Sequence, residues 1–140
     1  EVLQNVWYAE DQMSQALTFS SVRPFKSDSD TALQTDATYP EIWIKNARNG
    51  EEAKVKYFLS TSPGDCGGRV SVICERRVGT STTVSALTSA NIVVDRLSFT
   101  IKGNSQQPLI TMSIGARSAL SPLQRIDVQA TVSMRAITFE

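Results

Sequence analysis

The first twenty residues carry a helical stripe of apolar side chains, and most of the chain after them alternates as β-strands do. Apolar positions separated by steps of three and four fall on one face of a helix. The stripe consists of Val2, Leu3, Val6, Trp7, Ala9, Met13, Ala16 and Leu17. Pro24 ends the helix, because the residue before a proline is pushed out of the helical region. We therefore expect one amphipathic helix over residues 1–20.

The start of this helix has no capping residue. Ser, Thr, Asp and Asn are the residues that usually cap a helix, and none of them precedes the stripe. Glu1, Val2 and Leu3 are already in register with it. The pattern predicts that the native helix extends further toward the N-terminus and that any targeting segment was removed before residue 1.

The remainder of the chain predicts strands joined by turns. Residues 21–40 are polar and read as a long loop, and residues 79–89 read as a Ser/Thr-rich connection. The strand signals cover residues 41–45, 53–60, 69–78, 92–101, 109–115 and 126–134. A helix followed by hairpins predicts an α+β fold, with the helix packed on an antiparallel β-sheet. We expect a single domain over 1–140, made of the helix (1–20), an αβ-loop (21–40) and a β-sheet region (41–140).

Alternation in the later strands also predicts which side chains face the core. Apolar residues recur at every second position, so they lie on one face of a strand. They are Val55, Tyr57, Leu59, Leu97, Phe99, Ile101, Ile110, Met112, Ile114, Ile126, Val128, Ala130, Val132 and Met134.

The composition argues against most catalytic and metal chemistry. The 140 residues include 14 Lys+Arg and 14 Asp+Glu but no histidine, which is the commonest general base and metal ligand. Paired carboxylates can perform acid–base chemistry, but nothing in the sequence brings the four candidates together: Glu51, Glu52, Asp95 and Asp127. Asp28 and Asp30 resemble the start of a calcium loop, but the later loop positions do not follow. We expect no enzyme, no cofactor and no catalytic residue.

Two cysteines, Cys66 and Cys74, flank residues 67–73, and the first of them lies in a loop dense in turn residues (62–68). Without histidine or further cysteines a metal site is disfavoured, and the spacing does not match a C-x-x-C redox motif. A disulfide that closes the loop is the preferred interpretation. Disulfides persist in oxidising compartments, so this pairing predicts an exported protein.

The order of the strand motifs resembles the globular domain of type IV pilins and type II secretion pseudopilins. The resemblance is sharpest at residues 97–103 (LSFTIKG), 107–114 (QPLITMSI) and 126–135 (IDVQATVSMR), with support from 55–60 (VKYFLS) and 73–78 (ICERRV). It covers essentially the whole chain. The chain departs from the family at its front, where family members carry a long apolar helix with an early glutamate.

This resemblance implies that the protein is a structural subunit of a bacterial filament, as a major or minor pilin or a pseudopilin. The implied partners are other pilin subunits, and the implied location is the cell surface after anchoring in the inner membrane. No apolar run here approaches the roughly 20 residues of a membrane helix, so anchoring would use a segment before residue 1. We expect the helix to assemble the filament through Val2, Leu3, Val6 and Trp7.

Recognition of DNA or glycan is the alternative function. Basic residues cluster around the cysteine hairpin and predict contacts with phosphates, despite a net charge of zero. They are Arg69, Arg76, Arg77, Lys54 and Lys56. Glycan sites line up exposed aromatic rings, for which the candidates are Trp43, Tyr39 and Tyr57.

Overall fold

The computed structural model describes residues 2–20, 24–26, 31–48, 51–103, 107–121 and 123–134. One helix, α1 (Val2–Thr18), opens the described chain. The strands that follow are β1 (Phe25–Lys26), β2 (Thr31–Ala32), β3 (Thr38–Tyr39), β4 (Glu41–Arg48), β5 (Glu51–Leu59), β6 (Ile73–Val78), β7 (Thr82–Ala86), β8 (Ile92–Gly103), β9 (Pro108–Ser118) and β10 (Arg125–Ser133). The calcium-loop candidates Asp28 and Asp30 lie outside the described residues.

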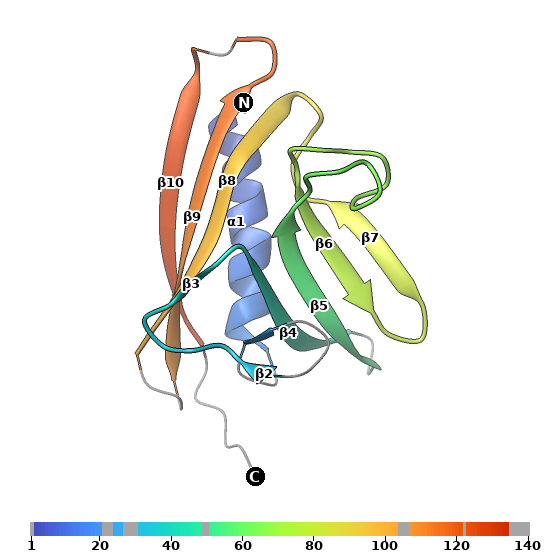
Figure 1. The fold of residues 1–140 in the computed structure, drawn as a ribbon, viewed down its shortest axis with the longest axis vertical. Coiled ribbons are helices and arrows are strands. Elements are labelled where there is room, and N and C mark those ends of the chain that lie inside the picture. The colour runs from blue at the N-terminus through green and yellow to red at the C-terminus, as the bar shows by residue number, and fades with distance from the viewer. Residues whose placement is uncertain are drawn as a thin grey trace.

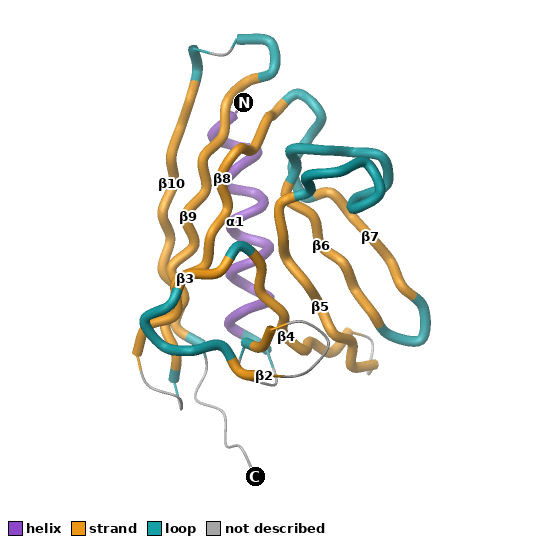
Figure 2. Tube along the Cα trace, viewed as in Figure 1, coloured by secondary structure: helices purple, strands orange, loops and turns teal. Residues whose placement is uncertain are grey.

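The strands form two antiparallel sheets on two sides of the helix. Sheet A has the order β2-β1-β4-β5-β6-β7, and sheet B has the order β10-β9-β8-β3. In Figure 1, α1 runs between β8–β10 of sheet B and β4–β6 of sheet A. Figure 2, coloured by secondary structure, shows that strands make up much more of the described chain than the helix α1 does. The predicted α+β fold with one sheet is therefore wrong, because the chain is mostly β and divides its strands between two sheets.

Two segments also contain strands that the sequence did not predict. Residues 21–40, predicted as a loop, contain the two-residue strands β1, β2 and β3, which are added at the edges of both sheets. Residues 82–86, predicted as part of a connection, form β7 at the edge of sheet A. These strands are short or polar, so they lack the apolar alternation by which a strand is predicted from sequence. The predicted strand 69–78 is shorter than expected, since β6 begins only at Ile73.

The crossing from sheet A to sheet B lies near the start of α1. After β7 the chain turns, and the Val94 amide donates to the Ser71 carbonyl over 2.8 Å. Beyond this point β8 pairs with β9 and β3 rather than with β7. The Ser89 amide donates to the Asn5 side chain on α1 over 3.2 Å. The helix is thereby tied to the segment where the two sheets diverge.

The core lies where α1 meets both sheets. The helix contributes Val2, Val6, Ala9, Met13 and Leu17, each 6% exposed or less. The predicted core positions of β8 and β9 are confirmed, because all six are buried: Leu97, Phe99, Ile101, Ile110, Met112 and Ile114. In β10 the burial is weaker: Val132 is buried and the following Met134 is fully buried, whereas Ile126, Val128 and Ala130 are only partly buried. Burial of this apolar surface is the main force that holds sheet A, α1 and sheet B together.

Candidate functional site

The outward side of α1 carries large apolar side chains that the described chain leaves partly exposed. Leu3, Trp7 and Tyr8 are 40%, 55% and 57% exposed. We call these three residues the outer helix face. An amphipathic surface helix ordinarily places polar residues on this side. Leu3 and Trp7 lie one turn apart, whereas Tyr8 lies about 100° around the helix from Trp7, so the three side chains spread over a broad part of the outward surface. Extended exposed apolar surface marks an interaction site more often than single exposed residues do.

This placement divides the predicted assembly residues. Val2 and Val6 lie in the core, at 6% and 0% exposed, and are not available to another subunit in this structure. Leu3 and Trp7 are exposed, as an assembly surface requires. The four share one stripe in the sequence, but the stripe is broader than the surface that the two sheets can cover. Tyr8, which is not part of the predicted stripe, is also exposed.

A second exposed apolar feature lies at the same end of the molecule. The loop between β9 and β10 is located at the end where α1 begins (Figure 1). Its Leu120 and Leu123 are 84% and 97% exposed. The N-terminal part of α1 is also uncharged, since Glu10 and Asp11 are the first charged residues of the helix. An uncharged apolar surface can be buried without the cost of desolvating an ion.

The predicted disulfide between Cys66 and Cys74 is present. It closes the loop between β5 and β6, which turns through positive φ angles at Gly67 and Gly68. The two cysteines pack with Phe58 and Val72 in a small core of their own on the side of sheet A away from α1. This second core holds the loop independently of the helix layer.

Hydrogen bonds to Asp65 and Ser60 also order this loop. The Asp65 carboxylate accepts from the Thr61 and Ser62 amides over 3.3 and 3.2 Å. The Thr61 amide is the largest cause that lowers the pKa of Asp65 below its ordinary value. The buried Ser60 hydroxyl donates to the Arg69 carbonyl over 2.6 Å. The charged end of Asp65 is therefore part of the loop's own turn.

The predicted basic cluster does not form one surface. Lys54 and Lys56 lie on the side of sheet A away from α1, and Arg76 is the cross-strand partner of Lys56. Arg77 is on the opposite side, beneath α1, because successive strand residues face opposite ways. Arg69 lies on the exposed disulfide loop. The prediction of a single five-residue patch is corrected to three basic residues on one sheet face.

Aromatic rings underlie two of these three basic side chains. Phe25 and Trp43 stack with ring centroids 6.0 Å apart, and the Lys54 ammonium lies 5.8 Å from the Phe25 centroid. The Lys56 ammonium lies 4.4 Å from the Phe58 centroid and 5.8 Å from that of Trp43. Such cation–π contacts hold a lysine stem flat over apolar surface. The charges thus have fixed positions on this face.

Acidic groups reduce the positive charge of this sheet face. Lys56 forms an ion pair with Glu41 at 3.6 Å. A hollow of about 370 Å³ on the same side is lined by Lys56 and Arg76 but also by Glu41 and Asp65. Its net charge is therefore near zero, which weakens the case for a phosphate-binding surface.

The aromatic candidates for glycan binding do not form a platform. Tyr57 is 1% exposed and donates its hydroxyl to Glu75 over 2.8 Å. Trp43 is 6% exposed beneath Lys56. Tyr39 is partly buried, and its hydroxyl accepts from the Gln34 amide over 2.9 Å. These rings serve packing and turn structure.

Two carboxylates considered for catalysis do come together, through an arginine. Arg125 forms ion pairs with both Asp95 and Asp127 on the outer side of sheet B. It lies across Gly115, where an added Cβ would be 2.7 Å from the Arg125 Nη2 atom. A register shift between Val94 and Arg96 brings Asp95 into reach. The Arg125 hydrogen bond lowers the pKa of Asp95, so the carboxylate stays ionised and is unsuited to be a general acid.

Within the described residues, no group of three or more His, Cys, Asp and Glu side chains is arranged to hold a metal ion. In the same part of the chain, no helix is both long and apolar enough to cross a membrane. Comparisons with models of protein families, with curated proteins and with solved structures find no match to this chain.

Proposed function

We propose that this chain is a structural subunit of a bacterial type IV pilus-like filament, as a pilin or pseudopilin, and that α1 is its assembly element. The observation that carries the proposal is the exposure of Leu3, Trp7 and Tyr8 on the outward side of the helix. Neighbouring subunits would cover this outer helix face. The resemblance of the strand motifs to pilins and pseudopilins supports the same role.

A second copy of the chain, or a related subunit, is the occupant that fits this face best. Residues 2–9 of α1 carry no charge, so two such helices can approach without like-charge repulsion or unpaired buried ions. Packing two apolar helix faces against each other removes both from water at once. A filament needs a head-to-tail interface that does not close, so the two helices would meet through different parts of their surfaces, and that contact would then repeat along the axis.

The proposed location is the cell surface, within the filament. The Cys66–Cys74 disulfide is consistent with assembly outside the cytoplasm, because disulfides form and persist in oxidising compartments. This cross-link would stabilise the β5–β6 loop of a subunit that faces the external medium.

The experiment that tests the proposal is the double variant Trp7→Ser/Tyr8→Ser in the cells that produce the protein. Serine has nearly the same helix propensity as tryptophan and tyrosine, so the helix itself is retained. We expect sheared filaments, counted by electron microscopy, to be lost while the purified domain keeps its melting temperature. Val6 is unsuitable for this test, since a polar group there would disrupt the core.

The control is Val84→Ser on β7. Val84 is 42% exposed, close to the 40% of Leu3, but it lies on an edge strand of sheet A. Loss of this apolar side chain should leave filament number unchanged. Normal filaments from the Trp7→Ser/Tyr8→Ser variant would contradict the assembly role of α1.

Binding of DNA by sheet A is a second candidate. The observation in its favour is the gathering of Lys54, Lys56 and Arg76 on one sheet face. We expect retention of a DNA duplex at about 50 mM salt that falls steeply as salt is raised, since phosphate contacts release counterions. Lys54→Gln/Arg76→Gln should reduce this retention. No retention by the unmodified chain at low salt would eliminate this candidate.

A further inference from the structure

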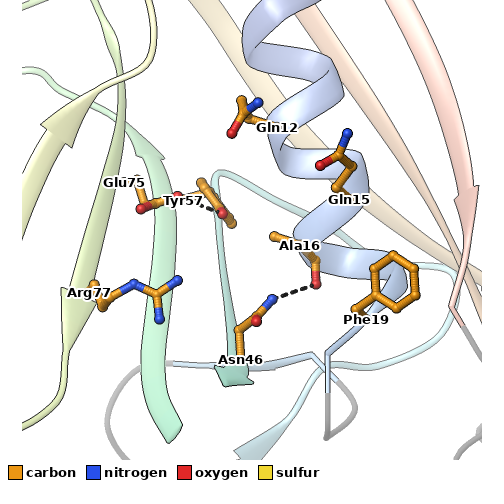
Figure 3. Close-up of a pocket in the computed structure, with 8 residues that line it drawn as sticks. All are labelled: Gln12, Gln15, Ala16, Phe19, Asn46, Tyr57, Glu75 and Arg77. Carbon is orange, nitrogen blue, oxygen red and sulfur yellow. Dashed lines mark hydrogen bonds between the residues drawn. The ribbon is translucent and has the colours of Figure 1, made fainter. Parts of the chain in front are cut away.

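A polar cavity of about 200 Å³ lies between the second half of α1 and the helix-facing side of sheet A. Figure 3 shows Glu75 and Arg77 extending from β6 toward the helix, with Gln12 and Gln15 on α1 and Asn46 on β4 around them. This side of the sheet is otherwise the apolar core, with Ile42, Ile44 and Val55 fully buried. The concentration of polar groups here is the exception on that face.

Arg77 brings unsatisfied donors into this cavity. Its Nε and Nη1 atoms are buried and find no hydrogen-bond acceptor among the described residues. These two atoms carry three N–H groups, and a guanidinium stays charged at all physiological pH values. Burying donors of a charged group without acceptors costs more than burying neutral ones. The site is therefore incomplete without an acceptor from outside the protein.

Glu75 provides the opposite charge in the same cavity. It is two residues from Arg77, which places both on the same side of β6 about 6.6 Å apart along the strand. No ion pair joins the two in the described structure, and Glu75 Oε2 accepts from the Tyr57 hydroxyl over 2.8 Å. Tyr57 is almost fully buried, so this hydrogen bond holds the carboxylate in position. The cavity has one fixed negative and one positive end.

The helix α1 adds to the unequal distribution of charge in the cavity. Asn46 donates from its side-chain amide to the Ala16 carbonyl over 3.3 Å, which fixes β4 against the last turns of α1. The C-terminal end of a helix carries a partial negative charge. A ligand that is only an anion would meet both Glu75 and this helix end, and one that is only a cation would meet Arg77.

We propose that this cavity binds a small zwitterion of the amino acid class, with its carboxylate on Arg77 and its ammonium toward Glu75. A carboxylate oxygen accepts well from a guanidinium N–H, and charge-assisted hydrogen bonds of this kind are the strong ones. The site lies within one copy of the chain, so it does not depend on the filament proposal.

The test is a titration of the purified, isotopically labelled chain followed by NMR of the Arg77 Nε–H signal. Glycine, acetate and methylammonium are the probes, at equal ionic strength. We expect a saturable shift with glycine and at least about tenfold weaker binding of either single-charge probe, since each loses one charged contact.

Arg77→Gln and Arg76→Gln form a matched pair of variants. Because Arg77→Gln lacks the Nε–H signal, glycine binding to both variants is followed by the NMR signals of the backbone amides around the cavity. They are neighbours on β6 and remove the same charge, but Arg76 faces the other side of the sheet. We expect Arg77→Gln to abolish glycine binding and Arg76→Gln to preserve it. Glu75→Gln should remove the preference for glycine over acetate, which provides a second readout if Arg77→Gln folds poorly.

Three results would overturn the proposal. They are the absence of any saturable shift, equal binding of acetate and glycine by the unmodified chain, and equal loss of binding in Arg76→Gln and Arg77→Gln. The first would mean that water alone completes the guanidinium. The second would mean that Glu75 has no part in recognition.

Discussion

The two faces of α1 differ in what they contact, although the sequence gives both of them apolar residues. On the inner face, Val6, Ala9, Met13 and Leu17 are all 0% exposed between the two sheets. On the outer helix face, Trp7 and Tyr8 are more than half exposed. The inner face accounts for folding within one chain, and the outer face has apolar surface that this fold does not use.

This difference separates stability from assembly at the level of single residues. A substitution on the inner face removes contacts with both sheets and should act on unfolding. A substitution on the outer helix face removes surface that is already in water, so it should hardly change the free energy of unfolding. It should weaken assembly, in which another molecule covers this face.

Met13→Ala should have the largest effect. Met13 is fully buried among residues of both sheets, and truncating such a side chain costs about 2–5 kcal/mol through lost transfer energy and a residual cavity. Urea unfolding measures the change. Gln4→Ala, on the exposed side of the same helix, is the control and should alter stability by less than about 0.5 kcal/mol. Equal effects of the two variants would mean that the inner face is not the core.

Cys66→Ala/Cys74→Ala should have the next largest effect. The cysteines are 8 residues apart, and opening a loop of this size costs about 2–3 kcal/mol in the chain-entropy model. Because their small core is separate from the helix layer, the helical circular dichroism of the folded variant should be unchanged. Loss of helix signal in the folded variant would show that the two cores are coupled.

Acid should produce a smaller loss of stability that involves the outer side of sheet B. Arg125 lowers the pKa of Asp95 below the ordinary 3.8. A carboxylate whose pKa is depressed by folding stabilises the protein above its unfolded pKa, and this contribution is lost as pH falls through the folded pKa. Urea midpoints between about pH 5 and pH 2 should therefore decline.

Arg125→Gln isolates the Asp95 contribution to that decline. In this variant the acid-induced loss should become shallower, while the part due to Asp65, whose pKa is lowered by the Thr61 amide, remains. Identical pH profiles for the variant and the unmodified chain would show that the Arg125 ion pairs contribute nothing to folding.

The sequence predicted those parts of the fold in which periodicity and burial agree. The alternation of Leu97, Phe99 and Ile101 and of their partners on β9 correctly identified one buried face, because a strand with one face in the core must alternate. The disulfide was also predicted from spacing and composition alone. The division into two sheets was missed, because alternation identifies the strands β4–β6 and β8–β10 one by one but does not show that β8 pairs with β9 and β3 rather than with a strand of the other sheet. The strands β1, β2 and β3 were missed because they are too short for a period to appear.

The candidate sites were harder to predict than the core. Two-residue alternation already separates Arg76 from Arg77, so the division of the basic cluster was available from the sequence. The meeting of Asp95 with Arg125 depends on a bulge and on the bare backbone of Gly115, neither of which has a periodic signal. Similarly, one apolar stripe cannot show how many of its residues the sheets will cover.

The most direct test of the central claim is the accessibility of the outer helix face in isolated chains and in filaments. Both native cysteines are joined in the disulfide, so an introduced cysteine is the only free thiol. Tyr8→Cys and the control Val84→Cys would each be assembled as a minority with unmodified chains and treated with a maleimide. We predict that Tyr8→Cys reacts readily in the isolated chain and at least about tenfold more slowly in filaments, while Val84→Cys reacts equally in both. Equal reactivity of Tyr8→Cys in the two states would contradict the claim that α1 packs between subunits.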